Sequence, residues 1–284
     1  MIKLNYNGAH NLLSQVYYGE EWLGDVKDGF KGARGKLVEW FKNFNSFKVI
    51  AFQAENLEKV KNIKDKIRGI YNVGKHSVHI TDSKKEVIRT AGVVFNDNSI
   101  HFLNYGKPNK YISIHDKIDE FKNFANKNNI STDDMLIDSS CVLSCYGLRE
   151  AKDIDFFCSD NSKIKIKFEN INIHDEELKY YGEEKNELIY NPKNHFYFND
   201  IKFISFNLLY RMKKNRSEYK DQNDCNMMDA LIDNNQIKKN INRLKQSYFY
   251  GKIKLRQNLM NCLKGIGLYN VSKIIFNQLK VIKK

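Results

Sequence analysis

Two acidic residues on a predicted strand have the spacing to hold a divalent metal ion. Asp153 and Asp155 flank Ile154, and apolar residues follow them. Side chains at positions i and i+2 of a strand point to the same face, so both carboxylates can reach one cation while Ile154 points into the core. Carboxylate oxygens are ligands of Mg²⁺ and Mn²⁺. The triplet therefore predicts a site for one of these ions at Asp153 and Asp155.

The residues before the acidic pair form a second pattern. The apolar run Met135–Ile137 leads through Asp138 to two small residues, Ser139 and Ser140. We expect a short helix over residues 141–148 and then a polar loop before the acidic strand. Backbone amides at a helix N-terminus bind phosphate. The amides near Ser140 would therefore lie beside phosphate oxygens that a metal ion bridges.

This pattern resembles the signature of the DNA-polymerase-β-like nucleotidyltransferase superfamily, in its minimal form. That signature is an apolar residue, Gly and Gly or Ser, about a dozen residues, and then Asp-apolar-Asp or Glu-apolar. Here Ser139 and Ser140 occupy the Gly-Ser position, twelve residues follow, and Asp153–Phe156 closes the pattern. The departure is Ser139, because a side chain at this position can crowd the path of the triphosphate.

A second segment, residues 203–232, carries the same resemblance. After the core sheet, many minimal nucleotidyltransferases have a strand, a helix that ends in an apolar residue and Lys, and then Lys-Asp and a further Asp. The residues that match this spacing are Lys213, Lys220, Asp221 and Asp224. Glu218 replaces an Arg that is common in the family, and Arg216 lies nearby.

The resemblance implies roles for these residues. Asp153 and Asp155 would coordinate the metal, and the nucleotide would contact Ser139, Ser140, Arg149, Lys213 and Lys220. Lys213 and Lys220 are also typical of a solvated helix face. The family uses a third carboxylate on a neighbouring strand, which completes a second metal site or takes the proton from the attacking hydroxyl. We predict a long strand over residues 163–173, with Asp175 as the first candidate and Glu169 as the second.

The implied activity is Mg²⁺-dependent transfer of a nucleoside monophosphate from an NTP donor to an acceptor. Residues 188–198 and 263–276 are similar to segments of uncharacterised proteins from bacterial surface-polysaccharide gene clusters. This favours a sugar, sugar-phosphate or polyol-phosphate acceptor, or a glycan, in capsule or lipopolysaccharide biosynthesis. The alternatives are a toxin-type nucleotidyltransferase that modifies RNA or protein, a metal-dependent glycosyltransferase, and a catalytically inactive nucleotide-binding module.

Composition and cysteine usage indicate an ordinary folded chain. Of the 284 residues, 42% are hydrophobic and 13% aromatic, which supports a substantial core and argues against disorder. Five cysteines without a C-x-x-C pair argue against a disulfide scaffold and a zinc ribbon. No segment reads as a signal peptide or a membrane span. We therefore expect the protein to work in the cytoplasm.

The net charge of +13 is concentrated in the last 51 residues. Residues 234–284 contain twelve Lys or Arg and no Asp or Glu, whereas residues 1–233 contain 35 basic and 34 acidic residues. Apolar residues recur in this tail at helical spacing: Leu255, Leu259, Cys262, Leu263, Ile266, Ile274, Ile275 and Leu279. A basic amphipathic helix is suited to an anionic membrane at the inner face, to nucleic acid, which we favour less, or to the acidic face of its own protein.

The predicted fold class is α/β (α+β), in three parts. Residues 1–126 form a small α/β domain of unknown role, with strands at 47–52, 77–80 and 100–103 and helices at 56–71 and 82–95. Residues 127–233 form a nucleotidyltransferase-like mixed sheet flanked by helices. Residues 234–284 form the basic helical tail.

Two features of the N-terminal part have further chemical potential. The Gly-rich segment 28–36 carries Lys31, Arg34 and Lys36 and can wrap an anion, although an ordinary surface loop is the more common use of such a sequence. His79 and Asp82 have the spacing of a general base and the residue that orients it, although a single histidine on a strand is usually structural.

Overall fold

The computed structural model describes residues 1–41 and 46–266, and the chain divides into two compact units, Met1–Arg216 and Ser217–Lys284. The predicted limits at residues 126 and 233 do not coincide with this division. Within the first unit the rings of Phe102, Phe196 and Phe203 stack in series, with centroid separations of 4.6 Å and 5.4 Å. Phe102 belongs to the N-terminal helices and the other two rings to the sheet, so this stack joins the two regions. The N-terminal helices also have a hydrophobic cluster of their own, which includes Leu13, Leu37 and Val93.

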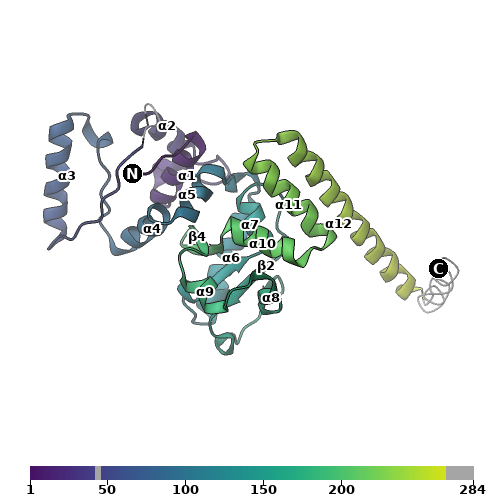
Figure 1. Ribbon diagram of the computed structural model, residues 1–284. Helices are drawn as coiled ribbons and strands as arrows, with labels where there is room; N and C mark the ends of the chain where they lie inside the picture. Colours follow the sequence, from purple (N-terminus) through teal and green to yellow (C-terminus); the bar gives the residue numbers. More distant parts are fainter. Residues whose placement is uncertain (42–45, 267–284) are drawn as a thin grey trace. The chain divides into compact units, whose positions relative to one another are not determined.

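Helices fill the region before the sheet (Figure 1): α1 (Tyr6–Val16), α2 (Lys31–Trp40), α3 (Leu57–Tyr71), α4 (Lys84–Val94), α5 (Asp97–Tyr105) and α6 (Ser113–Lys127). The prediction of a small α/β domain is wrong here, because residues 1–41 and 46–127 show no strand and only one isolated bridge, between Ile2 and Phe47. Residues 100–103 lie in α5, whose first turn is capped by the Asn96 side chain. A short apolar run suits either structure, and this cap favours the helix.

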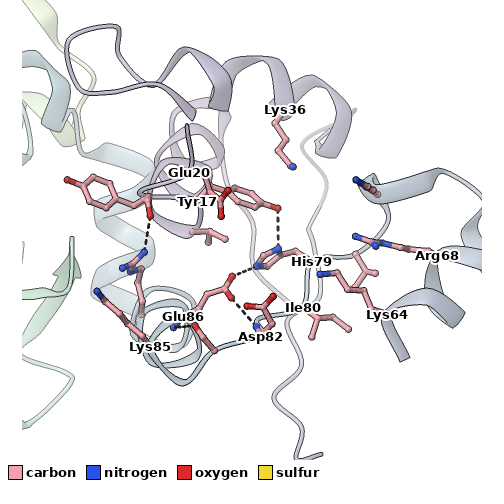
Figure 2. Close-up of a pocket in the computed structure, with 16 residues that line it drawn as sticks. Tyr17, Glu20, Lys36, Lys64, Arg68, His79, Ile80, Asp82, Lys85 and Glu86 are labelled. Atoms are coloured by element: carbon pink, nitrogen blue, oxygen red, sulfur yellow. Dashed lines mark hydrogen bonds and ion pairs between the residues drawn. The ribbon is translucent and has the colours of Figure 1, made fainter. Parts of the chain in front are cut away.

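Helices α3 and α4 occur where the sequence predicts them. The hydroxyl of Ser83 accepts a hydrogen bond from the backbone N–H of Glu86, so Ser83 caps α4. His79, in the extended segment before α4, contacts Tyr17 and Glu86 (Figure 2). The prediction that Asp82 orients His79 is therefore wrong, because the carboxylate that contacts the His79 ring is that of Glu86.

The Gly-rich segment 28–36 is largely helical, because α2 begins at Lys31. The predicted loop therefore ends at Phe30. Gly32 lies against the backbone of Trp22, whose carbonyl oxygen would be 2.1 Å from a Cβ at this position. Only glycine allows such a close approach. Packing of α2 on the Glu21–Leu23 turn thus accounts for this glycine without a bound anion.

The sheet of the first unit has five strands in the order β3-β2-β1-β5-β4. They are β1 (Met135–Asp138), β2 (Ile154–Cys158), β3 (Ile171–Ile173), β4 (His195–Phe198) and β5 (Ile201–Ile204). β1 pairs antiparallel with β2 and parallel with β5, so the predicted mixed sheet is confirmed. Every residue of β1 and β5 is buried, as expected for central strands covered on both faces. Helices α7 (Ser140–Cys145), α9 (Lys185–Tyr190) and α5 pack against the sheet.

A tight hairpin connects β4 and β5. Its two loop residues, Asn199 and Asp200, have φ values of 49° and 62°. Positive φ at both positions is the geometry of a type I′ turn, which matches the twist of the flanking strands. Both oxygens of Asp200 accept hydrogen bonds from Arg89, at 2.8 Å and 3.0 Å, and this pair joins the hairpin to α4.

The long strand predicted over residues 163–173 is wrong, because only Ile171–Ile173 forms β3. The Asn128 side chain binds the earlier backbone instead. Its oxygen accepts from Lys165 N at 2.7 Å and Ile166 N at 2.8 Å, and its amide donates to Ile166 O at 3.0 Å. These bonds satisfy backbone groups that a ladder would otherwise use.

The second unit contains two packed helices, α11 (Tyr219–Ile232) and α12 (Gln236–Gly265). The prediction that the basic tail is helical is confirmed over residues 236–265. Ile274, Ile275 and Leu279 of the predicted apolar stripe lie outside the described residues. In the described part of the chain, no helix combines the length and apolar character needed to cross a membrane.

Candidate nucleotide and metal site

The acidic pair lies at the start of β2. Asp155 is the second residue of this strand, and Asp153 immediately precedes it. Ile154 between them is fully buried, whereas both aspartates are only partly buried. The alternation matches the predicted arrangement, in which two carboxylates share the side of the strand that faces away from the core.

A third carboxylate, Asp138, stands opposite this pair. It ends β1, and its Cα partner in the β1–β2 ladder is Asp155. Asp138 is fully buried, with one oxygen 2.8 Å from His174 Nδ1 and the other accepting a hydrogen bond from the Tyr181 hydroxyl. Neither Asp138 nor His174 is among the predicted site residues. The available signal was an acidic residue at the end of an apolar run, but only the strand register shows what it faces.

The surroundings of Asp155 disfavour its charged form. Burial raises its pKa from 3.8 to about 6, and the negative charges of Asp153 and Asp138 act in the same direction. The positive charge of His174 and a hydrogen bond from the Ser139 side chain oppose this shift. A carboxylate in such a position gains from a bound cation, because the cation offsets both the desolvation and the repulsion.

His174 balances the negative charges around Asp155. Burial lowers its pKa, but the hydrogen bond to Asp138 and the charges of Asp138, Asp155 and Glu177 outweigh burial, so the pKa of His174 is raised. Glu177 in turn lies 3.2 Å from Arg216 at the end of α10 (Phe206–Arg216). Acidic and basic groups therefore alternate from the sheet to this helix.

The turn before the short helix α7 is bonded to the acidic segment. Ser139 has φ 59° and ψ −123°, a backbone conformation that glycine adopts readily and other residues rarely do. A glycine at this position, as in the signature that the sequence resembles, would adopt this conformation without strain. The Ser140 hydroxyl and the Cys141 thiol both lie near the backbone carbonyl of Asp153, at 3.5 Å and 3.3 Å. Turn and acidic pair thus form one connected structure.

The two candidates for the family's third carboxylate lie in different surroundings. Asp175 follows β3, and its Oδ2 accepts from Asn161 at 2.8 Å and from Lys185 at 2.9 Å. Its Oδ1 is buried and has no hydrogen-bond partner among the described residues. Glu169 is exposed. The groups that set the pKa of Asp155 are instead His174, Asp153 and Asp138.

The predicted phosphate-binding cations also differ in exposure. Arg149 is partly buried in the loop before β2. Lys213 lies on α10, and only 1% of its surface is exposed. Its contact with a nucleotide phosphate stays a prediction. Lys220, in the second unit, forms an ion pair with Glu218 at 3.0 Å. Asp221 and Asp224 are both fully buried.

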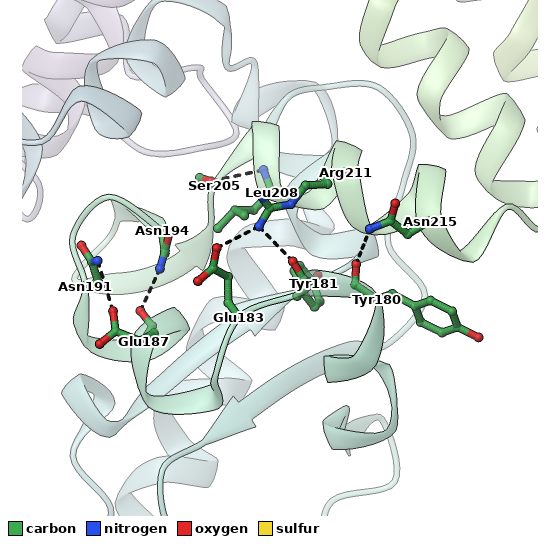
Figure 3. A network of polar contacts seen from close by, with 10 residues as sticks. All are labelled: Tyr180, Tyr181, Glu183, Glu187, Asn191, Asn194, Ser205, Leu208, Arg211 and Asn215. Carbon is green, nitrogen blue, oxygen red and sulfur yellow. Dashed lines mark hydrogen bonds and ion pairs between the residues drawn. The ribbon is translucent and has the colours of Figure 1, made fainter.

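Helix α10 is fastened to the segment that follows the candidate site (Figure 3). Arg211 donates to the Tyr181 carbonyl at 2.9 Å and to Glu183 at 3.1 Å, and Asn215 donates to the Tyr180 carbonyl at 2.8 Å. The hydroxyl of Tyr181 bonds Asp138. The polar contacts of α10 therefore extend, through one tyrosine, to the carboxylate that faces Asp155.

The donor set suits a hard divalent cation. Mg²⁺ is usually held by one or two carboxylates, together with water and substrate phosphates, and rarely by an all-protein cage. Asp153 and Asp155 match this description. No group of three or more His, Cys, Asp or Glu side chains within the described residues has the geometry of a metal site. A cation here would therefore take its remaining ligands from substrate and solvent.

Comparison with known proteins gave no further support for an identity. The resemblance to nucleotidyltransferases rests on the residues of two motifs. The first lies on β1, α7 and β2, and the second lies on β5, α10 and α11. No family model, no curated protein and no solved structure matches this chain.

Proposed function

We propose that the protein is a Mg²⁺-dependent nucleotidyltransferase with Asp153 and Asp155 as its metal ligands. The supporting observation is the Asp153–Asp155 pair at the start of β2. The turn at Ser139 and Ser140 contacts this pair, and Asp138 lies opposite Asp155 in the neighbouring strand. A single acidic residue with a raised pKa could be explained by burial alone. Two partly exposed carboxylates on one side of a strand, next to a strained turn, are better explained by a ligand.

The proposed reaction is displacement at the α-phosphorus of an NTP. The acceptor hydroxyl oxygen forms a bond to this phosphorus, the bond to the bridging oxygen of the β-phosphate breaks, and pyrophosphate leaves. A bound Mg²⁺ would neutralise charge on the phosphate oxygens. The residues of the chain orient the triphosphate through the Ser139–Ser140 turn and receive the acceptor proton. We assign the proton to Asp175 on the resemblance, as the first candidate for the third carboxylate; it follows β3, the strand that pairs with β2.

The proposed acceptor is a sugar, sugar phosphate or polyol phosphate of surface-polysaccharide biosynthesis. This proposal rests on the resemblance of residues 188–198 and 263–276 alone. Pyrophosphate release would be measured with each NTP and Mg²⁺, with and without each acceptor class. Release that requires one acceptor and is absent in Asp153→Ala/Asp155→Ala supports the assignment. Modification of RNA or protein, or cleavage of a nucleotide sugar, would identify the toxin-type or glycosyltransferase alternative instead.

We also propose that α12 holds the protein at an anionic membrane surface. The helix carries eight Lys or Arg and no acidic residue. Exposed apolar residues follow one stripe along it: Ile237, Ile241, Leu244, Tyr248, Leu255, Leu259 and Ile266. Successive basic residues near an anionic bilayer contribute about 1 kcal/mol each, and the stripe adds apolar burial. An acidic protein surface could also pair with the basic residues of α12, but it would not require a continuous stripe of exposed apolar residues.

A further inference from the structure

The first unit contains a cavity of about 400 Å³ outside the proposed active site. It is lined by residues of α1, α2, α3 and α4 and of the segments between these helices. Six basic side chains contribute to its wall: Lys36, Lys64, Arg68, Lys75, Lys85 and Arg89. In Figure 2, Lys64 and Arg68 extend from α3 toward His79, and Lys36 extends from α2 into the same space. Its volume is within the range of small-molecule sites.

The charges of the cavity are not balanced within it. Three acidic residues line it, namely Glu20, Asp82 and Glu86. Glu86 already accepts from His79 and from the backbone N–H of Asp82, at 2.8 Å and 3.0 Å. Arg89 is neutralised by Asp200, which is not a lining residue. The neutral donors to Glu86 do not cancel its charge, so the five other basic residues face three carboxylates, Glu20, Asp82 and Glu86, and a positive excess remains.

Arg68 has an unused donor. Its Nε is buried and has no hydrogen-bond partner among the described residues, and its nearest carboxylate oxygen, on Asp65, is 3.7 Å from NH1. A buried guanidinium N–H without an acceptor is costly. The Arg68 side chain as a whole is 26% exposed, so an anion in the cavity would pair with the accessible part of its guanidinium.

His79 is part of the wall and is held from both sides. The Tyr17 hydroxyl lies 3.1 Å from Nδ1, and Glu86 lies 2.8 Å from Nε2. Burial lowers the pKa of His79, although Glu86 opposes this shift. With Glu86 ionised, the neutral ring donates from Nε2 to Glu86 and accepts at Nδ1 from Tyr17. Both ring nitrogens are thus engaged, which argues for a binding wall and against the predicted general base.

We propose that this cavity binds a small phosphorylated ligand, a phosphomonoester or a diphosphate. A phosphate group carries about two negative charges and three acceptor oxygens, which matches several convergent lysines and one arginine with a partly exposed side chain. An extended polynucleotide suits a long basic surface better than a cavity of this size. The inference is independent of the proposed catalytic function, because the two sites share no residue.

The two tryptophans of the chain provide a direct readout, because both lie beside the cavity. Lys36 Nζ is 4.6 Å from the Trp22 ring centroid and 5.6 Å from that of Trp40. The intact chain would be titrated with pyrophosphate and with a sugar monophosphate while tryptophan fluorescence is recorded, with sodium sulfate at equal ionic strength as the reference. We expect a saturable change with a phosphate probe that sulfate does not reproduce.

Paired variants on one helix then locate the site. Lys64→Gln/Arg68→Gln removes two lining charges, whereas Lys61→Gln/Lys66→Gln removes two exposed charges of α3 that do not line the cavity. No residue of α3 is buried, so neither pair disturbs a core. The lining pair should raise the half-saturating concentration on the order of tenfold or more, since each lost charge-assisted bond weakens binding. The control pair should leave it within about twofold.

A third variant separates this site from the proposed active site. Asp153→Ala/Asp155→Ala should keep the fluorescence titration of the wild type, even if nucleotidyl transfer is lost or was never present. The proposal is overturned by a wild type without a saturable phosphate response, by equal effects of the two α3 pairs, or by loss of the response in Asp153→Ala/Asp155→Ala.

Discussion

His174 Nδ1 lies 2.8 Å from Asp138 Oδ2, and Asp138 stands opposite Asp155 in the β1–β2 ladder. A fully buried aspartate and a partly buried histidine therefore form a pair beside the strand that carries the proposed metal ligands. Because His174 carries positive charge toward both aspartates, it lowers the pKa of Asp155 while its own pKa is raised. The charge state of His174 therefore affects both the stability of the fold and the charge of the candidate site.

The first prediction concerns Asp155→Asn without added metal. The folded pKa of about 6 exceeds the unfolded value, so the wild type loses stability as pH rises from about 4 to about 6 and does not regain it above that range. The shift corresponds to on the order of 2–3 kcal/mol at neutral pH. Asp155→Asn should raise the Tm at pH 7.5 in EDTA, and the difference should vanish near pH 4. Glu169→Gln, at an exposed carboxylate, should change little; a lower Tm for Asp155→Asn at pH 7.5 would contradict the account.

The second prediction concerns His174→Gln. The raised pKa of His174 adds stability that is fully present below its unfolded pKa and is lost as pH rises through the folded value. The variant leaves the buried Asp138 carboxylate without its cation, which should cost about 1–3 kcal/mol. Denaturant unfolding at pH 6 and pH 9 measures this cost. It should be larger at pH 6, and equal losses at both pH values would contradict the assigned charge.

The third prediction concerns the turn. Ser139 has a positive φ, which costs on the order of 1–3 kcal/mol for a residue with a side chain. Ser139→Gly relieves this strain, but it also loses the bond to Asp155 and raises the backbone entropy of the unfolded state, and both of these effects destabilise the fold. We expect a net gain of about 1 kcal/mol in the free energy of unfolding. Ser140→Gly, in α7, is the matched control and should lose about 1 kcal/mol. The same sign for both variants would show that the strain assignment is wrong.

The fourth prediction concerns α12 and lipid vesicles. The chain should cosediment with vesicles containing phosphatidylglycerol, and less with neutral phosphatidylcholine, because the helix is both basic and apolar along one stripe. Leu255→Glu/Leu259→Glu should abolish binding. Gln257→Glu/Asn261→Glu adds the same charge at exposed positions outside the stripe and should weaken binding only in part. If both variants lose vesicle binding to the same extent, the charge of α12 alone accounts for the binding, and the apolar stripe gives no argument for a bilayer.

The fifth prediction concerns Asp175→Asn. If Asp175 takes the acceptor proton, the variant should lower kcat on the order of a hundredfold or more. Binding of the NTP should be retained, because Asp175 does not belong to the proposed metal ligands. Loss of NTP binding together with kcat would place Asp175 in the metal site. An unchanged kcat would exclude it from proton transfer.

The sequence predicts the elements around the acidic pair well and the N-terminal part poorly. Alternation around Ile154 and the small residues before α7 are local signals, so β1, β2 and the turn could be predicted. The run at residues 100–103 carries no period long enough to separate strand from helix. Whether these residues form a helix depends on the Asn96 cap and on the stacking of Phe102 against Phe196. Phe196 is far from Phe102 in the sequence, so this contact could not be predicted.

The interactions of the candidate site depend even more on tertiary register. Asp138 and His174 are 36 residues apart and meet only because β1, β2 and β3 align at particular positions. The same holds for His79, whose partner is Glu86, one helical turn beyond the expected Asp82. Spacing in the sequence identified the histidine, but the Ser83 cap set the orientation of the helix that carries Glu86.

The central claim is tested most directly by calorimetric titration of each NTP with Mg²⁺ into the wild type and into Asp153→Ala/Asp155→Ala. The account predicts metal-dependent binding of one NTP to the wild type and none to the variant, with both proteins folded by circular dichroism. Binding of no NTP to the folded wild type, or equal binding to both proteins, would contradict the assignment of Asp153 and Asp155 as ligands of a metal-bound nucleotide.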